Sequence, residues 1–106
     1  MFLIRRIYKT KPGQARKVAT LGHKACVLLE EAGQRREPRV YFNGGTTPGE
    51  TNIVVLEWID ESIQSVFRGE NEFPENALIF AREIGPLVDE TWIEFSELLT
   101  PDKMVD

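Results

Sequence analysis

Arg6 is the residue of this chain whose position points most directly to chemistry, because its neighbours predict that it is buried. On one face of a strand it would lie between Ile4 and Tyr8, which are an aliphatic and an aromatic side chain. A buried charge without a partner costs several kcal/mol or more. Arg6 therefore needs either a carboxylate, for which Glu94 and Glu97 are the candidates, or an anionic ligand. Both alternatives stay open, and the ion pair is the one we favour.

Other residue types that support catalysis are sparse. His23 is the only histidine and Cys26 the only cysteine, which excludes an internal disulfide and argues against a transition-metal site. Helical spacing places His23 on the polar side of its helix, so we expect it to be exposed and outside any acid–base chemistry. The Asn43–Gly45 segment lacks the lysine and hydroxyl residue of a phosphate-binding loop. We expect no metal and no cofactor, and no residue is assigned as catalytic.

Hydrophobic periodicity predicts one α+β domain over residues 1–106. Four strands alternate with two helices in the order βαββαβ, which is the ferredoxin-like arrangement of a four-stranded antiparallel sheet with both helices on one face. Asp60 is expected to cap a short turn that carries Ile63, Val66 and Phe67. The strands are predicted over 2–9, 39–42, 52–59 and 91–99, and the helices over 14–32 and 74–88.

The first helix has one edge of small residues that includes Ala19, Gly22 and Cys26. Small side chains either allow another element to approach closely or leave a cavity. We expect the second helix to pack closely there, with an apolar pocket as the alternative.

The third strand is apolar on both faces. A strand that is apolar on both faces must be covered on both, yet the two helices cover one face only. A second copy of the same sheet is the simplest cover, so the sequence predicts a homodimer through the sheet face. One face carries Val54, Leu56 and Trp58, and the other carries Ile53, Val55 and Ile59.

Charge excludes some partners. A pI near 5.1 and a net charge of -4 argue against a nucleic-acid binder, no segment predicts a membrane span, and the lone cysteine suits the cytoplasm. Residues 1–39 carry a balance of +7 and residues 40–106 a balance of -11. Such asymmetry indicates either a basic patch for an anion or two halves that neutralise each other in one sheet, and we expect the second.

Two segments resemble the dimeric α+β barrel superfamily. They are the end of the first strand with its basic-Pro-Gly turn, Arg6–Gly13, and the third strand ending in Trp-Ile-Asp-Glu, Ile53–Glu61. The chain is most similar to the antibiotic-biosynthesis-monooxygenase-like and NIPSNAP-like members. This resemblance implies two sheets packed face to face as a barrel, with a pocket in each protomer between sheet and helices.

The resemblance also implies a site. Several members point a tryptophan into the pocket where this chain has Trp58, and haem-degrading members carry an asparagine near the position of Arg6. Those members hold haem through a histidine of the second helix, and residues 74–88 contain none, so haem is not expected. Packing of Trp58 as an ordinary core aromatic stays an alternative.

Two functions follow from these residues. In the first, the protein binds an apolar or aromatic small molecule, with Tyr8, Trp58 and Phe80 walling the pocket and Arg6 holding an anionic oxygen. A cofactor-independent monooxygenase, cyclase or isomerase reaction would fit that site. In the second, the protein is a non-catalytic binding or stress-associated dimer with the same fold.

Overall fold

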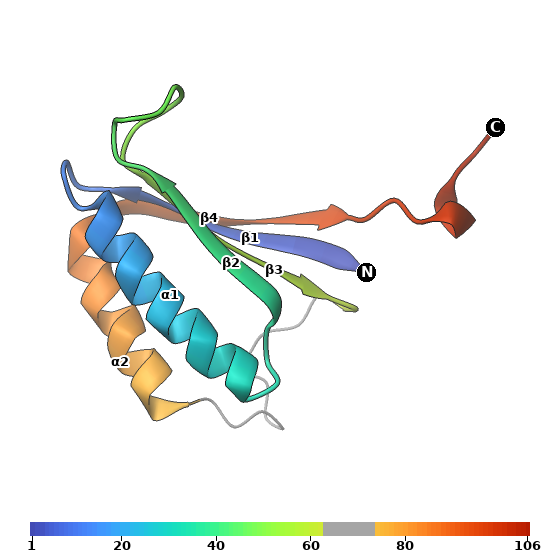
Figure 1. Cartoon of the computed structure of the whole chain (residues 1–106), viewed down its shortest axis with the longest axis horizontal. Helices are drawn as coiled ribbons and strands as arrows, with labels where there is room; N and C mark the ends of the chain where they lie inside the picture. Colours follow the sequence, from blue (N-terminus) through green and yellow to red (C-terminus); the bar gives the residue numbers. More distant parts are fainter. Residues whose placement is uncertain (63–73) are drawn as a thin grey trace.

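The computed structural model describes residues 1–62 and 74–106. Within them lie four strands, two α-helices and two short 3-10 helices (Figure 1). The predicted turn with Ile63, Val66 and Phe67 lies outside the described residues. The elements in chain order are β1 (Phe2–Thr10), α1 (Ala15–Glu31), β2 (Arg36–Asn43), β3 (Ile53–Asp60), α2 (Glu75–Ile84), η1 (Gly85–Leu87), β4 (Val88–Glu97) and η2 (Pro101–Lys103).

The strands form one antiparallel sheet in the order β2-β3-β1-β4. Both helices lie on the same side of it, and no α-helix of residues 1–62 and 74–106 lies on the other side (Figure 1). This is the ferredoxin-like α+β arrangement that the sequence predicts. We call the two sides the helix face and the open face.

The strand register decides which side chains share a face. Ile4 lies opposite Trp58 on β3 and opposite Phe95 on β4, and directly opposed residues of antiparallel strands point to the same side. The helix face of the central strands is the hydrophobic core, and Val54, Leu56 and Trp58 all lie in it, as predicted. Its other members include Ile4, Ala15, Val18, Ala19, Leu21, Cys26 and Ile84.

At its edge of small residues, helix α1 lies close to the sheet rather than to α2. A Cβ atom added at Gly22 would be 2.6 Å from the Cδ2 atom of Leu56 on β3, so only glycine fits without movement of Leu56. Cys26 and Ala19 also pack into the sheet-side core. The expectation that the second helix packs along this edge is therefore wrong at Gly22. Helix α2 instead meets Ala25 and Leu29 of α1 through Ala77.

Element boundaries differ from the predicted ones mostly around α2. Pro74 caps the helix instead of occupying its first turn, and the α-helix ends at Ile84. Pro86 has no N–H to continue the α-helical bonds, and the chain tightens there into η1. Val88, expected at the end of the helix, begins β4 instead. Strand β2 is longer than predicted. Its pairing with β3 includes Arg36, is interrupted by a register shift between Arg36 and Arg39, and resumes at Arg39.

The two oppositely charged halves of the chain do neutralise each other. Most salt bridges of the described residues join a basic residue before position 40 to an acidic residue after it. These pairs are Arg5–Glu94, Lys9–Glu50, Lys11–Asp89, Arg36–Glu61 and Arg39–Glu57.

Candidate functional site

Four side chains on the helix face form what we call the arginine–aromatic cluster: Arg6 and Tyr8 of β1, Trp58 of β3, and Arg35. Trp58 is 6% exposed and packs in the core. The guanidinium carbon of Arg35 lies 3.7 Å from the centre of the Trp58 ring, which is within cation–π distance. The site thus combines apolar walls with two cations.

Arg35 was not predicted from the sequence. Gly33, at φ +75°, ends α1, and the chain turns back towards the sheet before β2 begins. Arg36 pairs with Ile59 on the open face, so the preceding residue, Arg35, faces the helix side beside Trp58. The signal was present in the helix stop at Gly33, but the register needed to use it cannot be read from composition or periodicity.

Arg35 is a partly buried cation with few partners. Its Nη1 donates to the carbonyl of Gln34 at 3.3 Å, whereas its buried Nε has no hydrogen-bond partner among the described residues. No carboxylate of the described chain lies within salt-bridge distance. Burial lowers the pKa of Arg35 to about 10, although nearby Cys26 and Asp60 act in the opposite direction. The side chain therefore stays charged at neutral pH at a cost to the fold.

Arg6 is only partly buried, not buried as its neighbours in the sequence predict, and it has no carboxylate partner in the described residues either. Its Nη1 donates to the hydroxyl of Thr91 at 3.4 Å. The predicted partner Glu94 binds Arg5 at 3.0 Å, and the other candidate, Glu97, binds Lys103 at 3.1 Å. The expectation of a structural ion pair with either glutamate is wrong.

Register explains this outcome. Arg5, not Arg6, lies opposite Glu94 on β4, so Glu94 belongs to the open face. Glu97 shares the face of Arg6 but lies opposite Phe2, four residues further along β1. The carboxylates that the sequence offered to Arg6 are on the wrong side of the sheet or too far along it.

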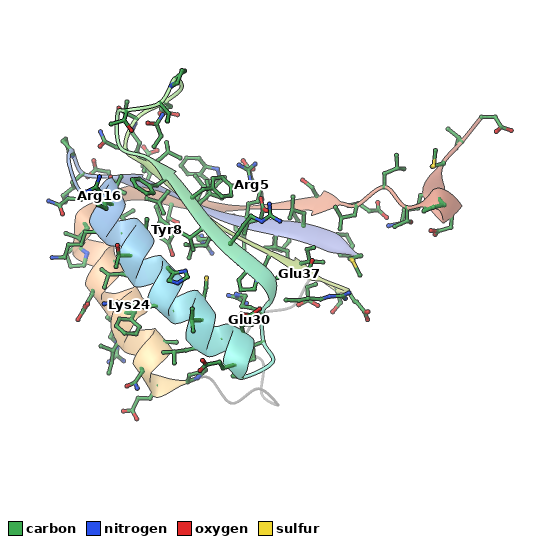
Figure 2. All side chains as sticks on the ribbon, viewed as in Figure 1. Arg5, Tyr8, Arg16, Lys24, Glu30 and Glu37 are labelled. Atoms are coloured by element: carbon green, nitrogen blue, oxygen red, sulfur yellow. The ribbon has the colours of Figure 1, made fainter. Side chains whose placement is uncertain are left out.

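Tyr8 supplies the polar tip of the cluster. Figure 2 shows it between the sheet and α1. Burial raises the pKa of its phenol, and the nearby charges of Arg6 and Arg35 only partly oppose this effect. Burial also raises the pKa of the Cys26 thiol. Both groups are therefore neutral at physiological pH, and the phenol is available as a hydrogen-bond donor.

Phe80, the fourth predicted ligand-binding residue, comes from α2. It is partly buried against the same core as Tyr8 and Trp58 and also against the α1–α2 contact. The Lys24 ammonium lies 5.8 Å from the centre of its ring. The structure thus places all four predicted residues, Arg6, Tyr8, Trp58 and Phe80, on the helix face.

The open face carries a second group of charges, in which Arg5, Arg39, Glu57 and Glu94 are paired. The hydroxyl of Tyr41 donates to Glu57 at 2.8 Å and accepts from Arg5 Nε at 3.2 Å. Glu94 accepts from Arg5 and from the Trp92 indole, at 3.0 and 3.2 Å. With the Arg39–Glu57 pair at 3.3 Å, this open-face network crosses all four strands.

The remaining chemistry is limited. His23 is exposed on α1, as predicted. No group of three or more histidine, cysteine or acidic side chains that could hold a metal lies among residues 1–62 and 74–106. None of the helices in the described part of the chain is long and apolar enough to cross a membrane. The arrangement can bind an anion or stabilise a developing oxyanion with guanidinium and phenol donors.

Comparison with known proteins identifies the fold of the chain. No protein-family model and no curated protein matches the sequence. An uncharacterized NIPSNAP domain protein from Burkholderia xenovorans matches over 100% of both chains, with a TM-score of 0.66 and 17% identity. A NIPSNAP family protein from Agrobacterium tumefaciens covers 94% of this chain and 93% of its own, with a TM-score of 0.65 and 17% identity. The chain therefore has the ferredoxin-like α+β fold of NIPSNAP-domain proteins.

Proposed function

We propose that the protein is a cytoplasmic homodimer that binds a small molecule with an apolar or aromatic body and an acidic group, between its sheet and its helices. One observation carries the proposal. Arg6 lies on the helix face of the central strand without a carboxylate from the described residues, although Arg5 beside it has one. An anionic ligand would supply the missing charge, and Trp58, Tyr8 and Phe80 would supply apolar contact.

If the protein is an enzyme, a metal-free monooxygenase-like reaction suits these residues. In such a reaction the substrate itself supplies the electrons as an enolate, and oxygen accepts them. The guanidinium of Arg6 and the neutral phenol of Tyr8 would stabilise the enolate oxygen, while Trp58 helps to exclude water.

A second candidate function is binding without turnover. The sole histidine is exposed on α1, so no imidazole base is available beside Tyr8 and Trp58. A binding or stress-associated protein needs the cations and the aromatic walls but no base. Consumption of oxygen with a bound acidic aromatic compound would separate the enzyme from the binding protein.

The dimer rests on the composition of the open face. Tyr41 and Trp92 remain 38% and 39% exposed there, beside half-buried Leu3, Ile53 and Ile59. The charges of the open-face network are already paired, so a second sheet could cover them without orphaning an ion. A dimer of this kind should bury roughly 2,000 Å² or more in total.

Two measurements test these proposals. For the site, Arg6→Met should abolish binding of an aromatic acid such as benzoate without lowering the thermal stability, and Arg16→Met, at an exposed arginine of α1, is the matched control. Lost stability with unchanged binding would refute the ligand-binding role. For the assembly, sedimentation at micromolar concentration should give twice the 12.1 kDa mass of the chain. A monomer would refute the dimer.

A further inference from the structure

We propose that Arg6 and Arg35 together bind a dianionic group, and that the ligand is a phosphate monoester of an aromatic or apolar compound. The inference rests on the proposed function and narrows it from an acidic ligand to one with two negative charges. It starts from Arg35, which no sequence pattern indicated.

The first step is the charge balance of the site. Neither guanidinium has a carboxylate of the described chain within salt-bridge distance, whereas Arg5, Arg36 and Arg39 each have one. Both guanidiniums lie on the helix face, where Arg6 is opposite Leu56 and Arg35 stacks on Trp58 two residues further along β3. The positive charge of Arg6 also contributes to lowering the pKa of Arg35. A monoanion would leave one of these charges without compensation, and a dianion compensates both.

The second step is the set of available donors. Arg35 uses its flat face for Trp58, 3.7 Å away, which leaves the edge of the guanidinium for an acceptor in its plane. Its Nε is buried without a partner among the described residues, and Arg6 makes one long hydrogen bond, to Thr91. Tyr8 adds a neutral phenol donor. A phosphate monoester offers three terminal oxygens to such a set of donors.

The third step concerns the body of the ligand. In a bound phosphate monoester, the phosphate must lie near the two guanidinium groups while the organic part contacts apolar side chains. Trp58 and Phe80 pack in the same core as Tyr8, so the organic part that fits beside them is aromatic or aliphatic. A sugar phosphate would meet too few polar partners there.

Calorimetric titration with three probes of one aromatic body tests the inference. Phenyl phosphate carries two charges at pH 8, benzenesulfonate carries one on a similar tetrahedral group, and benzyl alcohol carries none. We expect phenyl phosphate to bind at least about tenfold more tightly than benzenesulfonate. Arg35→Gln and Arg6→Gln should each remove this advantage. Arg36→Gln, at the exposed neighbouring arginine that pairs with Glu61, is the matched control and should keep it.

The pH dependence of the wild-type protein gives a test that needs no variant. The second phosphate ionisation lies near pH 6, so the advantage of phenyl phosphate should disappear at pH 5. Tyr8, Cys26, Asp60 and Glu30 are the titratable groups whose charges reach the cluster. Their titration affects both anions, so benzenesulfonate measured over the same range corrects for it.

The outcomes separate this inference from the proposed function. If phenyl phosphate and benzenesulfonate bound with equal affinity and Arg6→Gln abolished the binding of both, the preference for a dianion would be refuted. The site for an acidic ligand would be retained. Full phenyl phosphate binding in Arg35→Gln, or an equal loss in Arg36→Gln, would also overturn the inference. If neither anion binds and an aromatic acid does not bind either, both proposals fall.

Discussion

Arg5 and Arg6 are consecutive residues of the same strand, and the two faces of the sheet treat them in opposite ways. On the open face, Arg5 meets Glu94 and Tyr41 within an extended network. On the helix face, Arg6 meets only the hydroxyl of Thr91 among the described residues, and Arg35 nearby lacks a carboxylate as well. Of these arginines, the two on the helix face are the ones without a carboxylate of the described residues.

This difference is the reverse of what stability alone would favour. A charge under helices loses more hydration than one on a bare sheet face, so it has the greater need of a partner. The chain nevertheless pairs Arg5 and leaves Arg6 and Arg35, which are both partly buried, without a carboxylate of the described residues. This contrast supports the proposed anionic ligand on the helix face and the proposed second sheet on the open face.

The largest expected effect is on the free energy of unfolding, and it compares a core residue of the helix face with a partly exposed residue of the open face. Ile4 is almost fully buried on the helix face, so Ile4→Ala should lower the free energy of unfolding by about 2–5 kcal/mol. Leu3→Ala, one residue away on the open face and half-exposed in the single chain, is the control and should cost clearly less in the separate chain, whereas the proposed dimer would add the loss of its contact across the interface. Urea denaturation of both variants at the same protein concentration measures the difference. Equal losses would mean that the faces are equally buried.

A smaller effect is expected from the two arginines. Arg5→Met removes a donor from Glu94 and from Tyr41, although the Trp92 indole still donates to Glu94. Because both Arg5 and Glu94 are partly exposed, the loss should be only about 0.5–1 kcal/mol. Arg6→Met should cause no loss, since it removes an uncompensated charge. Thermal melts of the pair of variants test the sign of this contrast. If Arg6→Met lowered the melting temperature and Arg5→Met did not, the comparison between the faces would be reversed.

The smallest and most local expected effect is on the pKa values of the two tyrosines. Burial raises the pKa of Tyr8, and burial together with the hydrogen bond to Glu57 raises the pKa of Tyr41. Arg6→Met should raise the pKa of Tyr8 further and leave Tyr41 unchanged, while Arg5→Met should do the opposite, because each arginine lowers the pKa of its own neighbour. Ultraviolet titration of phenolate in Tyr8→Phe and Tyr41→Phe backgrounds assigns the two transitions. A shift of both pKa values in one variant would contradict the separation of the faces.

The same tyrosines set a direction for stability against pH. An unfolded phenol ionises near pH 10, whereas the folded protein holds both phenols protonated to higher pH. The free energy of unfolding should therefore fall as pH rises through about 10 and above, because the unfolded state releases protons first. Tyr8→Phe and Tyr41→Phe should each reduce the slope of that fall in urea denaturation. An unchanged slope in both variants would contradict the assignment.

Much of the fold could be predicted from local patterns. Alternation over Ile53–Asp60, the Pro12–Gly13 turn and the helical stripes fixed the order of elements and the face of Trp58. The partners of Arg6 could not be predicted, because they depend on the register between β1 and β4, and a shift of one residue exchanges Arg5 for Arg6 opposite Glu94. Arg35 was missed because its position depends on where the chain returns to the sheet after Gly33, which is a tertiary property.

The two edge strands of the sheet have a consequence for assembly by strand pairing. The outer strand β2 contains Pro38, which has no N–H, next to Glu37 at φ 49° and a register shift, so a further strand cannot continue the ladder there. The other outer strand, β4, runs for ten residues without proline. Strand pairing between molecules is therefore disfavoured at the start of β2, and among the described residues the edge of β4 carries no such block.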